Sequence, residues 1–171
     1  MSKLTVTQRC SGVFITGTDT GVGKTVVTAA LAQQLSQRGI DVGVMKPVET
    51  GVASPTAATS DAVRLKTSSA VQDELELIRP YWFRMPVAPL TAARLERKPI
   101  GLANILAAHR RLQARHRVML VEGVGGVHVP ITKSADVLAL IQRTTLPVIV
   151  VGRVGLGGIN HARLTIESLR Q

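Results

Sequence analysis

The chain has 171 residues, of which 45% are hydrophobic and only 2% aromatic, and it carries a formal net charge of +10. This length predicts a single domain, residues 1–171, with one substantial core. The scarcity of aromatic side chains argues against an aromatic-rich β-sandwich and favours parallel α/β layers with aliphatic strands. The basic residues are spread out, and their one cluster, at residues 110–117, lacks aromatic neighbours, so a nucleic-acid partner is not expected.

Targeting signals are not evident in the sequence. No run of about 18 apolar residues predicts a membrane span, and the first residues lack the apolar stretch of a signal peptide. The lone Cys10 excludes an intramolecular disulfide and fits a reducing compartment. We therefore expect a cytoplasmic protein without a membrane partner.

The first elements along the chain surround a glycine-rich stretch at residues 17–25 that ends in Gly-Lys-Thr. An apolar run at residues 13–16 predicts a buried strand, and residues 26–38 have apolar side chains at helical spacing. This is the context of a P-loop, where backbone N–H groups hold phosphates, a lysine reaches the outer phosphates and a hydroxyl ligates magnesium. Lys24 and Thr25 are the residues predicted for these roles. An ordinary strand-to-helix turn is the alternative.

A second strand is predicted at residues 41–45, and it ends at Lys46. Because open α/β sheets bind ligands at the carboxyl ends of their strands, Lys46 is expected to point towards the P-loop. Residues 49–60 are rich in small side chains and predict a loop, whose order before ligand binding stays open. A short helix follows, and either Ser60 or Asp61 is able to cap it.

Between residues 71 and 99 the pattern is less regular. The aromatic residues 81–83 are expected to lie in the core rather than to form a base-stacking platform, and helices are predicted at residues 90–97 and 102–115. His109 and His116 lie seven positions apart there without an evident third metal ligand, so solvated positions are expected.

An apolar strand at residues 118–122 ends in Glu122. An acidic residue at the end of a buried strand beside a P-loop is the Walker B arrangement, in which the carboxylate completes the magnesium environment. Without the P-loop, a turn residue would be the default interpretation.

The last part of the sequence predicts a helix, a strand and a second helix. The first helix covers residues 134–142 with Ser134 as its cap, the strand covers residues 146–151, and the final helix runs through Arg170. Glycines at the start of that final helix expose its first N–H groups, which makes a second anion site. A tight strand-to-helix turn is the alternative.

Three blocks of sequence together resemble the dethiobiotin synthetases, the P-loop ligases of biotin biosynthesis. They are TGTDTGVGKT at residues 16–25, KPVETG at residues 46–51, and VEGVGG at residues 121–126 together with GLGGINH at residues 155–161. The resemblance implies a P-loop NTPase-like α/β fold, a mostly parallel sheet with helices on both faces. It also implies an ATP- and magnesium-dependent cyclo-ligase that joins CO2 to 7,8-diaminononanoate, giving dethiobiotin, ADP and phosphate.

The family's residue roles transfer to matching positions of this sequence. The implied nucleotide-binding residues are Thr18, Gly21, Val22, Gly23, Lys24, Thr25, Val26, Asp61, Glu122, Gly123, Val124 and Gly125. Magnesium would lie among Thr25, Asp61 and Glu122. Lys46 would act catalytically between carbamate and γ-phosphate, and Lys24 would act from the phosphate side. The implied substrate residues are Thr50 and Gly126, with Gly157, Gly158, Ile159 and Asn160 from a second subunit, which implies a homodimer with the active site at its interface.

Two other interpretations remain beside the ligase. Family members continue beyond the helix that ends near Gln171, so the chain resembles an N-terminal portion that lacks the family's C-terminal segment and its adenine-binding residues. A basic nucleotide-binding remnant without ligase turnover is therefore one alternative. A partitioning-type ATPase is the other, although such a protein is not expected to keep both residues 46–48 and residues 155–161.

Overall fold

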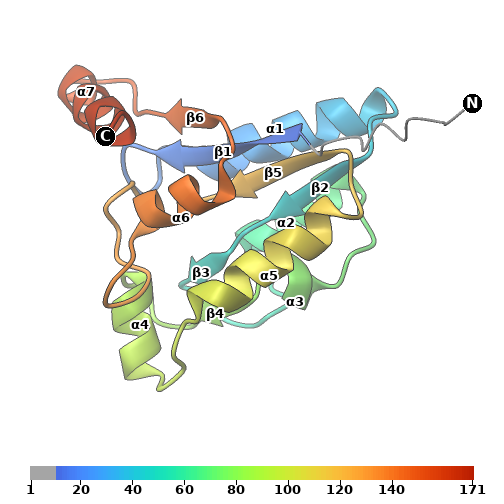
Figure 1. The fold of residues 1–171 in the computed structure, drawn as a ribbon, viewed down its shortest axis with the longest axis horizontal. Coiled ribbons are helices and arrows are strands. Elements are labelled where there is room, and N and C mark those ends of the chain that lie inside the picture. Colours follow the sequence, from blue (N-terminus) through green and yellow to red (C-terminus); the bar gives the residue numbers. More distant parts are fainter. Residues whose placement is uncertain (1–10) are drawn as a thin grey trace, which may run out of the picture.

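The structure, a computed structural model, describes residues 11–171. Its main sheet has four parallel strands in the order β2-β5-β1-β6 (Figure 1). These strands are β1 (Ser11–Gly17), β2 (Val42–Met45), β5 (Val118–Glu122) and β6 (Val148–Val151). The predicted strands at residues 13–16, 41–45, 118–122 and 146–151 are confirmed to within two residues. Cys10, on which the expected reducing compartment rests, lies outside the described residues.

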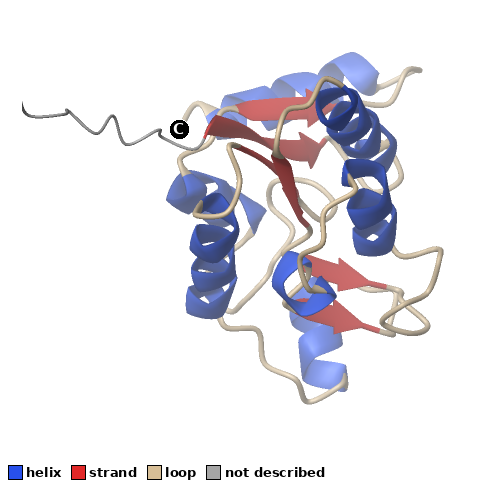
Figure 2. Ribbon diagram, turned by 90° about the vertical axis from the view of Figure 1, so that its right-hand side faces the viewer, coloured by secondary structure: helices blue, strands red, loops and turns tan. Residues whose placement is uncertain are grey.

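Helices cover both faces of this sheet (Figure 2). Neighbouring residues of a strand point to opposite faces, so Phe14 and Ile15 of β1 enter different apolar clusters. Ile15 packs in the cluster formed with α1 (Lys24–Gln37) and α2 (Asp61–Ser69). Phe14 packs in the cluster formed with α5 (Leu102–Gln113) and α6 (Val137–Thr144). Most apolar strand residues are aliphatic and pack in one or the other of these two clusters, which confirms the predicted layering.

A second, two-stranded parallel sheet lies beside the main sheet and was not predicted. It pairs β3 (Val48–Thr50) with β4 (Tyr81–Phe83), and Glu49 lies opposite Trp82. The helices α3 (Leu75–Ile78) and α4 (Pro89–Leu95) flank β4 in the sequence. Tyr81 and Phe83 are buried, as expected for core aromatics, whereas Trp82 between them is only partly buried. The predicted loop at residues 49–60 therefore begins with strand residues.

Three details differ from the sequence-based predictions. The helix α6 begins at Val137 and is capped by Asp136, whose Oδ1 accepts a hydrogen bond from the Ala139 N–H at 2.9 Å, and not by Ser134. His109 is buried in α5 rather than solvated. His116 follows α5 and pairs with two carboxylates. The solvated positions expected for both histidines are therefore wrong.

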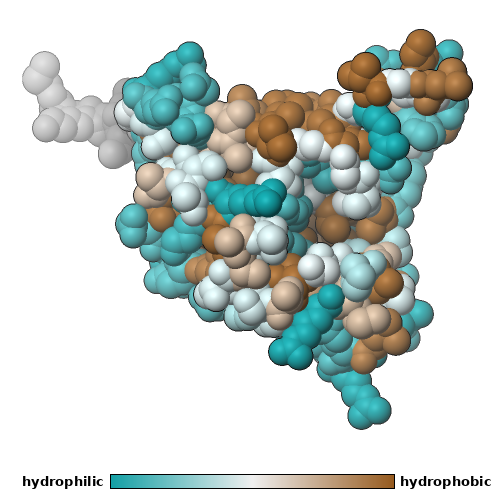
Figure 3. Space-filling model, turned by 180° about the vertical axis from the view of Figure 1, so that it is seen from behind, coloured by the Kyte–Doolittle hydropathy of each residue, from teal (hydrophilic) through white to brown (hydrophobic). Residues whose placement is uncertain are grey.

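The chain ends on an exposed helix, α7 (Gly158–Leu169), which follows β6 at the edge of the sheet. Hydrophobic side chains gather on the surface over this corner (Figure 3). Val154, Leu156 and Ile159 are all exposed there. Across residues 11–171, none of the helices combines the length and apolar character needed to span a bilayer.

Candidate active site

The glycine-rich turn between β1 and α1 has the backbone geometry of an anion-binding loop. Gly21 and Gly23 have φ values of 72° and 102°, a region that side chains with a Cβ rarely adopt. The helix α1 begins at Lys24, and none of the side chains that the structure describes caps its N-terminus. The N–H groups of its first turn are therefore free to bind an anion, and the helix dipole favours negative charge there. The Lys24 ammonium donates to the carbonyl oxygen of Asp19 at 2.8 Å.

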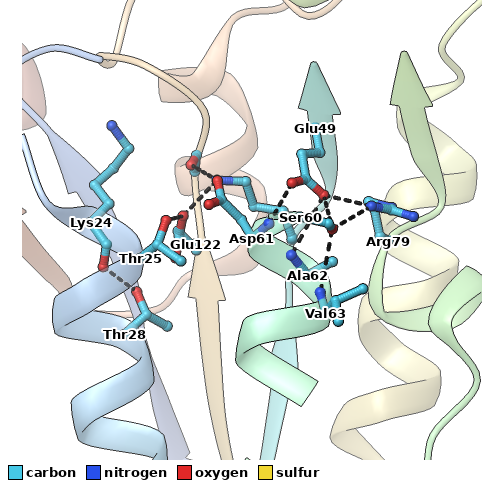
Figure 4. A network of polar contacts seen from close by, with 12 residues as sticks. Lys24, Thr25, Thr28, Glu49, Ser60, Asp61, Ala62, Val63, Arg79 and Glu122 are labelled. Atoms are coloured by element: carbon cyan, nitrogen blue, oxygen red, sulfur yellow. Dashed lines mark hydrogen bonds and ion pairs between the residues drawn. The ribbon is translucent and has the colours of Figure 1, made fainter. Parts of the chain in front are cut away.

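A second group of functional side chains meets beside α1 (Figure 4). The Thr25 hydroxyl donates to Glu122 Oε1 at 2.8 Å, which joins the P-loop helix to the end of β5. The Lys46 ammonium, at the end of β2, lies 2.5 Å from the same Glu122 oxygen and 2.8 Å from Asp61 Oδ2. It also donates to the carbonyl of Gly123 at 3.3 Å. All three Lys46 protons therefore have acceptors.

The electrostatics of this cluster follow from burial and from the opposed charges. Burial alone would lower the pKa of Lys46, but Glu122 and Asp61 outweigh it and hold that pKa above its ordinary value. Burial alone would raise the pKa of Asp61, and Lys46 outweighs it, so the pKa of Asp61 is lowered. The pKa of Lys24 is lowered by burial and then by repulsion from Lys46. Lys46 and Asp61 are therefore both charged at neutral pH.

The oxygen atoms of Thr25, Asp61 and Glu122 fit a magnesium ion. Carboxylate and hydroxyl oxygens are the ligands that this hard cation prefers. Within the described chain, Glu122 Oε2 is buried and has no hydrogen-bond partner, which is costly for a carboxylate oxygen unless a ligand completes it. The described residues contain no cluster of three or more His, Cys, Asp or Glu side chains able to hold a metal. Magnesium would thus also need oxygens from a phosphate, as is usual for this ion.

Most of the predicted site residues line a cavity of about 310 Å³. The predicted residues that line it are Gly21, Gly23, Lys24, Thr25, Val26, Lys46, Thr50, Asp61, Glu122, Val124 and Gly125. Those that do not line it are Thr18, Val22, Gly123, Gly126, Gly157, Gly158, Ile159 and Asn160. Thr18 and Gly126 line a neighbouring cavity of about 290 Å³, together with His128 and Ser168. Gly157 is the N-cap of α7, and Gly158, Ile159 and Asn160 form the first turn of that helix.

Three further residues, Thr20, Glu49 and Arg64, line the main cavity and were not predicted. Thr20 lies within the glycine-rich stretch, so its position was the only available signal. Arg64 lies one turn after Asp61 on α2, a spacing that places both residues on one helix face. Glu49 precedes Thr50, and its carboxylate is held by the buried Arg79 at 2.7 Å. Nothing local in the sequence signals that pairing.

The fold and this cavity together define a class of protein. A parallel sheet carries a glycine-rich turn with Lys24 and Thr25, and an acidic strand end lies hydrogen-bonded beside it. This is a P-loop nucleotide-binding domain of the NTPase type.

Comparisons with known proteins agree with this class and narrow it. Residues 11–171 match a protein family described as an AAA domain. The ATP-dependent dethiobiotin synthetase BioD of Anaeromyxobacter dehalogenans strain 2CP-1 is 46% identical over 160 residues, covering 94% of this chain and 71% of the relative. The synthetase of the same name from Thermodesulfovibrio yellowstonii is 41% identical over 169 residues, covering 94% of this chain and 70% of the relative. The synthetase from Bacillus velezensis is 43% identical over 154 residues, covering 90% and 66%. The chain belongs to the family of ATP-dependent dethiobiotin synthetases.

Proposed function

We propose that this chain is an ATP- and magnesium-dependent cyclo-ligase. It joins CO2 to 7,8-diaminononanoate and closes the cyclic urea of dethiobiotin, with release of ADP and phosphate. The observation that carries the proposal is the meeting of Thr25, Lys46, Asp61 and Glu122 at one cavity beside the P-loop. In this proposal the chain, residues 1–171, acts as one catalytic domain of a cytoplasmic enzyme.

The chemistry requires three successive steps around one phosphate. One amine of the substrate captures CO2 and loses a proton, which gives a carbamate. A carbamate oxygen then attacks the γ-phosphorus of ATP and ADP leaves. Finally the second amine attacks the carbonyl carbon of the mixed anhydride, phosphate leaves, and the ring closes. Most of what such a reaction needs from a protein is positioning and charge neutralisation.

In our proposal the P-loop holds the nucleotide. The free N–H groups at the start of α1 would bind the phosphates, and Lys24 would contact the outer phosphates from the same side. Residues Thr18, Val22, Gly123, Val124 and Gly125 would complete the nucleotide contacts. Bound between Thr25, Asp61 and Glu122, magnesium would neutralise charge on the phosphates during transfer.

Lys46 is proposed as the principal catalytic residue. Its raised pKa keeps the ammonium charged at neutral pH, and its position at the cavity places this charge beside both carboxylates. A fixed cation there would stabilise the anionic carbamate and the charge that develops on the γ-phosphate during transfer. Thr50, four residues further along, lines the same cavity and would hydrogen-bond the diamine or its carbamate. Gly126 would lie next to the substrate without a side chain in its way.

A second copy of the chain is proposed to complete the site. Among residues 11–171 no side chain caps the first turn of α7. The Gly158 N–H donates to the Gly155 carbonyl at 3.0 Å, and the N–H groups of Ile159 and Asn160 would bind the substrate's distal carboxylate. These residues, Gly157, Gly158, Ile159 and Asn160, do not line the cavity of their own chain. The exposed Leu156 and Ile159 support contact with a partner, because exposed apolar patches commonly mark interfaces.

Dethiobiotin formation by the full chain tests the proposal. The chain is supplied with 7,8-diaminononanoate, bicarbonate and magnesium ATP, and the product is scored by mass. The control is Lys46→Gln, which keeps a side chain of similar length without the charge, and circular dichroism verifies its fold. Product formed by the wild type above this control is the expected result. The proposal would be overturned if the rate of ATP hydrolysis did not depend on the diamine, or if the chain bound nucleotide without turnover. Either result would indicate a nucleotide-binding protein that is not a ligase.

A further inference from the structure

A buried ion pair between Glu49, which lines the cavity, and Arg79 lies on the side of the cavity away from the P-loop (Figure 4). Arg79, between α3 and β4, and Glu49, on β3, are 2% and 5% exposed, and Arg79 Nη1 lies 2.7 Å from Glu49 Oε2. Arg79 Nη1 also donates to the Ser60 hydroxyl at 2.6 Å, and its Nη2 donates to the carbonyl of Pro55 at 2.6 Å. One guanidinium therefore binds a strand, a loop and the cap of a helix.

The Glu49 carboxylate in turn holds the first residue of α2. Its Oε1 accepts from the Asp61 backbone N–H at 2.5 Å, and its Oε2 accepts from the Ser60 hydroxyl at 2.9 Å (Figure 4). Ser60 itself caps the helix through the Val63 N–H at 3.4 Å. A carboxylate at a helix N-terminus is favourable because it satisfies free N–H groups and complements the helix dipole.

These contacts hold the proposed magnesium ligand Asp61 and the residues next to the proposed substrate contacts. Asp61 is held through its backbone by Glu49 and through its side chain by Lys46 at 2.8 Å. Thr50 follows Glu49 directly in β3. Ile78, the residue before Arg79, accepts from the Lys46 backbone N–H through its carbonyl at 2.9 Å. Residues 78–79 therefore bind the Lys46 backbone directly. Through Glu49 they also contact the residue that precedes Thr50 and holds the backbone of Asp61.

We propose that Arg79 and Glu49 are positioning residues that hold the proposed magnesium ligand Asp61 and the diamine contact Thr50 in register with Lys46. Neither residue touches the reacting atoms in this proposal. A buried ion pair adds little net stability compared with well-packed apolar residues. We therefore assign this pair a role in the geometry of the site rather than in the stability of the fold. This inference rests on the proposed function, and it adds residues that act through Asp61.

The test compares Arg79→Lys and Arg79→Met with the wild type, with Arg115→Lys as the matched control. Arg115 also pairs with a carboxylate, Asp73, at 2.6 Å, but Asp73 does not line the cavity, whereas Glu49, the partner of Arg79, does. Lysine retains the charge at position 79, yet it cannot bind Glu49, Ser60 and Pro55 in the fixed fork of a guanidinium. If Arg79→Met fails to fold, the Arg79→Lys variant alone therefore tests the positioning role.

Two measurements are made on each variant. The first is the binding of a non-hydrolysable ATP analogue by calorimetry, with EDTA and then across a magnesium titration. The second is kcat for dethiobiotin. Because residues that orient metal ligands typically contribute 10–100-fold, we expect the half-saturating magnesium concentration to rise and kcat to fall by about tenfold or more in the Arg79 variants. Analogue affinity in EDTA should change less than about twofold, because the P-loop contacts remain.

The outcomes separate this inference from the proposed function. Magnesium dependence and kcat within about twofold of the wild type and of Arg115→Lys would overturn the positioning role, because a purely structural ion pair changes only the unfolding temperature. A wild type that makes no dethiobiotin would overturn the proposed ligase activity. The magnesium-dependent binding of the analogue would then still decide whether Arg79 and Glu49 position Asp61.

Discussion

The ammonium of Lys46 lies 2.5 Å from Glu122 Oε1, and both side chains are almost completely buried. Glu122 is wholly inaccessible to solvent, and its second oxygen has no protein partner among residues 11–171. Lys46 is therefore the principal compensation for a negative charge that burial would otherwise make very costly. The same lysine is the proposed catalytic cation, so stability and function depend on one contact.

Replacement of Lys46 by methionine is expected to destabilise the ligand-free protein strongly. Removing one partner of a buried ion pair typically lowers the free energy of unfolding by about 3–5 kcal/mol, because the other charge stays buried without compensation. The double variant Lys46→Met/Glu122→Gln should regain much of that loss. Urea denaturation without magnesium or nucleotide measures the free energy of unfolding of the single and double variants. If the loss of unfolding free energy in the double variant equals the sum of the losses in the two single variants, the two residues do not interact.

Gly125 is required by the backbone of the turn that follows β5. Its φ is +59°, and a Cβ there would lie 2.7 Å from Val129 Cγ2. We expect Gly125→Ala to lower the free energy of unfolding by about 1–3 kcal/mol. Gly126→Ala is the control, since its nearest neighbour, the Gly17 carbonyl oxygen, would lie at an ordinary 3.5 Å. Thermal unfolding of the two variants tests this, and equal losses would contradict it.

The sequence was informative where a short stretch carries its own signal. The P-loop needs only local residues, and an acid at the end of an apolar strand, Glu122, stands out once the P-loop is known. Lys46 was placed correctly beside these residues because parallel strands present their carboxyl ends at one edge of a sheet.

The sequence was uninformative where a residue's role depends on a distant partner. Glu49 is meaningful only through Arg79, thirty positions later, and the strands that carry Glu49 and Trp82 have three residues each. The start of α6 was misplaced because Ser134 and Asp136 are both good caps, and tertiary contacts decide between them. Asp136 is selected by its bridge to Pro130 and by its side chain, which lies 3.1 Å from His128 Nδ1.

His116 should make stability depend on pH. Its ring lies 2.7 Å from Asp41 and 2.6 Å from Asp73, and Arg115 also faces Asp73. Burial alone would lower the pKa of His116, but the two carboxylates outweigh it and raise that pKa. A raised pKa means that the folded state holds its proton more tightly than the unfolded state does. The stabilisation is therefore complete below about pH 6.5, the ordinary pKa, and is lost as the pH rises through the folded-state pKa above it.

We expect the free energy of unfolding to fall with pH above about 6.5, by at most about 1.4 kcal/mol per pH unit for this one proton. His116→Gln should lose this part of the slope. His161→Gln, at an exposed position on α7, is the control and should retain it. Urea denaturation between about pH 6 and 9 provides the measurement. A wild-type slope that survives in His116→Gln would assign the pH dependence to another group.

The exposed apolar side chains before and within α7 should drive association of two copies. Leu156 and Ile159 are fully or largely exposed in the single chain, at 110% and 83%. Burial of such a side chain typically contributes about 1.5–3 kcal/mol, which corresponds to about tenfold or more in a dissociation constant. We expect Leu156→Ser and Ile159→Ser each to weaken the dimer by about tenfold in sedimentation equilibrium, with little change in unfolding temperature. Leu95→Ser, at an exposed position on α4, is the control and should leave the dimer intact. A wild-type chain that sediments as a monomer at all concentrations would refute the proposed dimer, and the carboxylate of the substrate would then need another binding group.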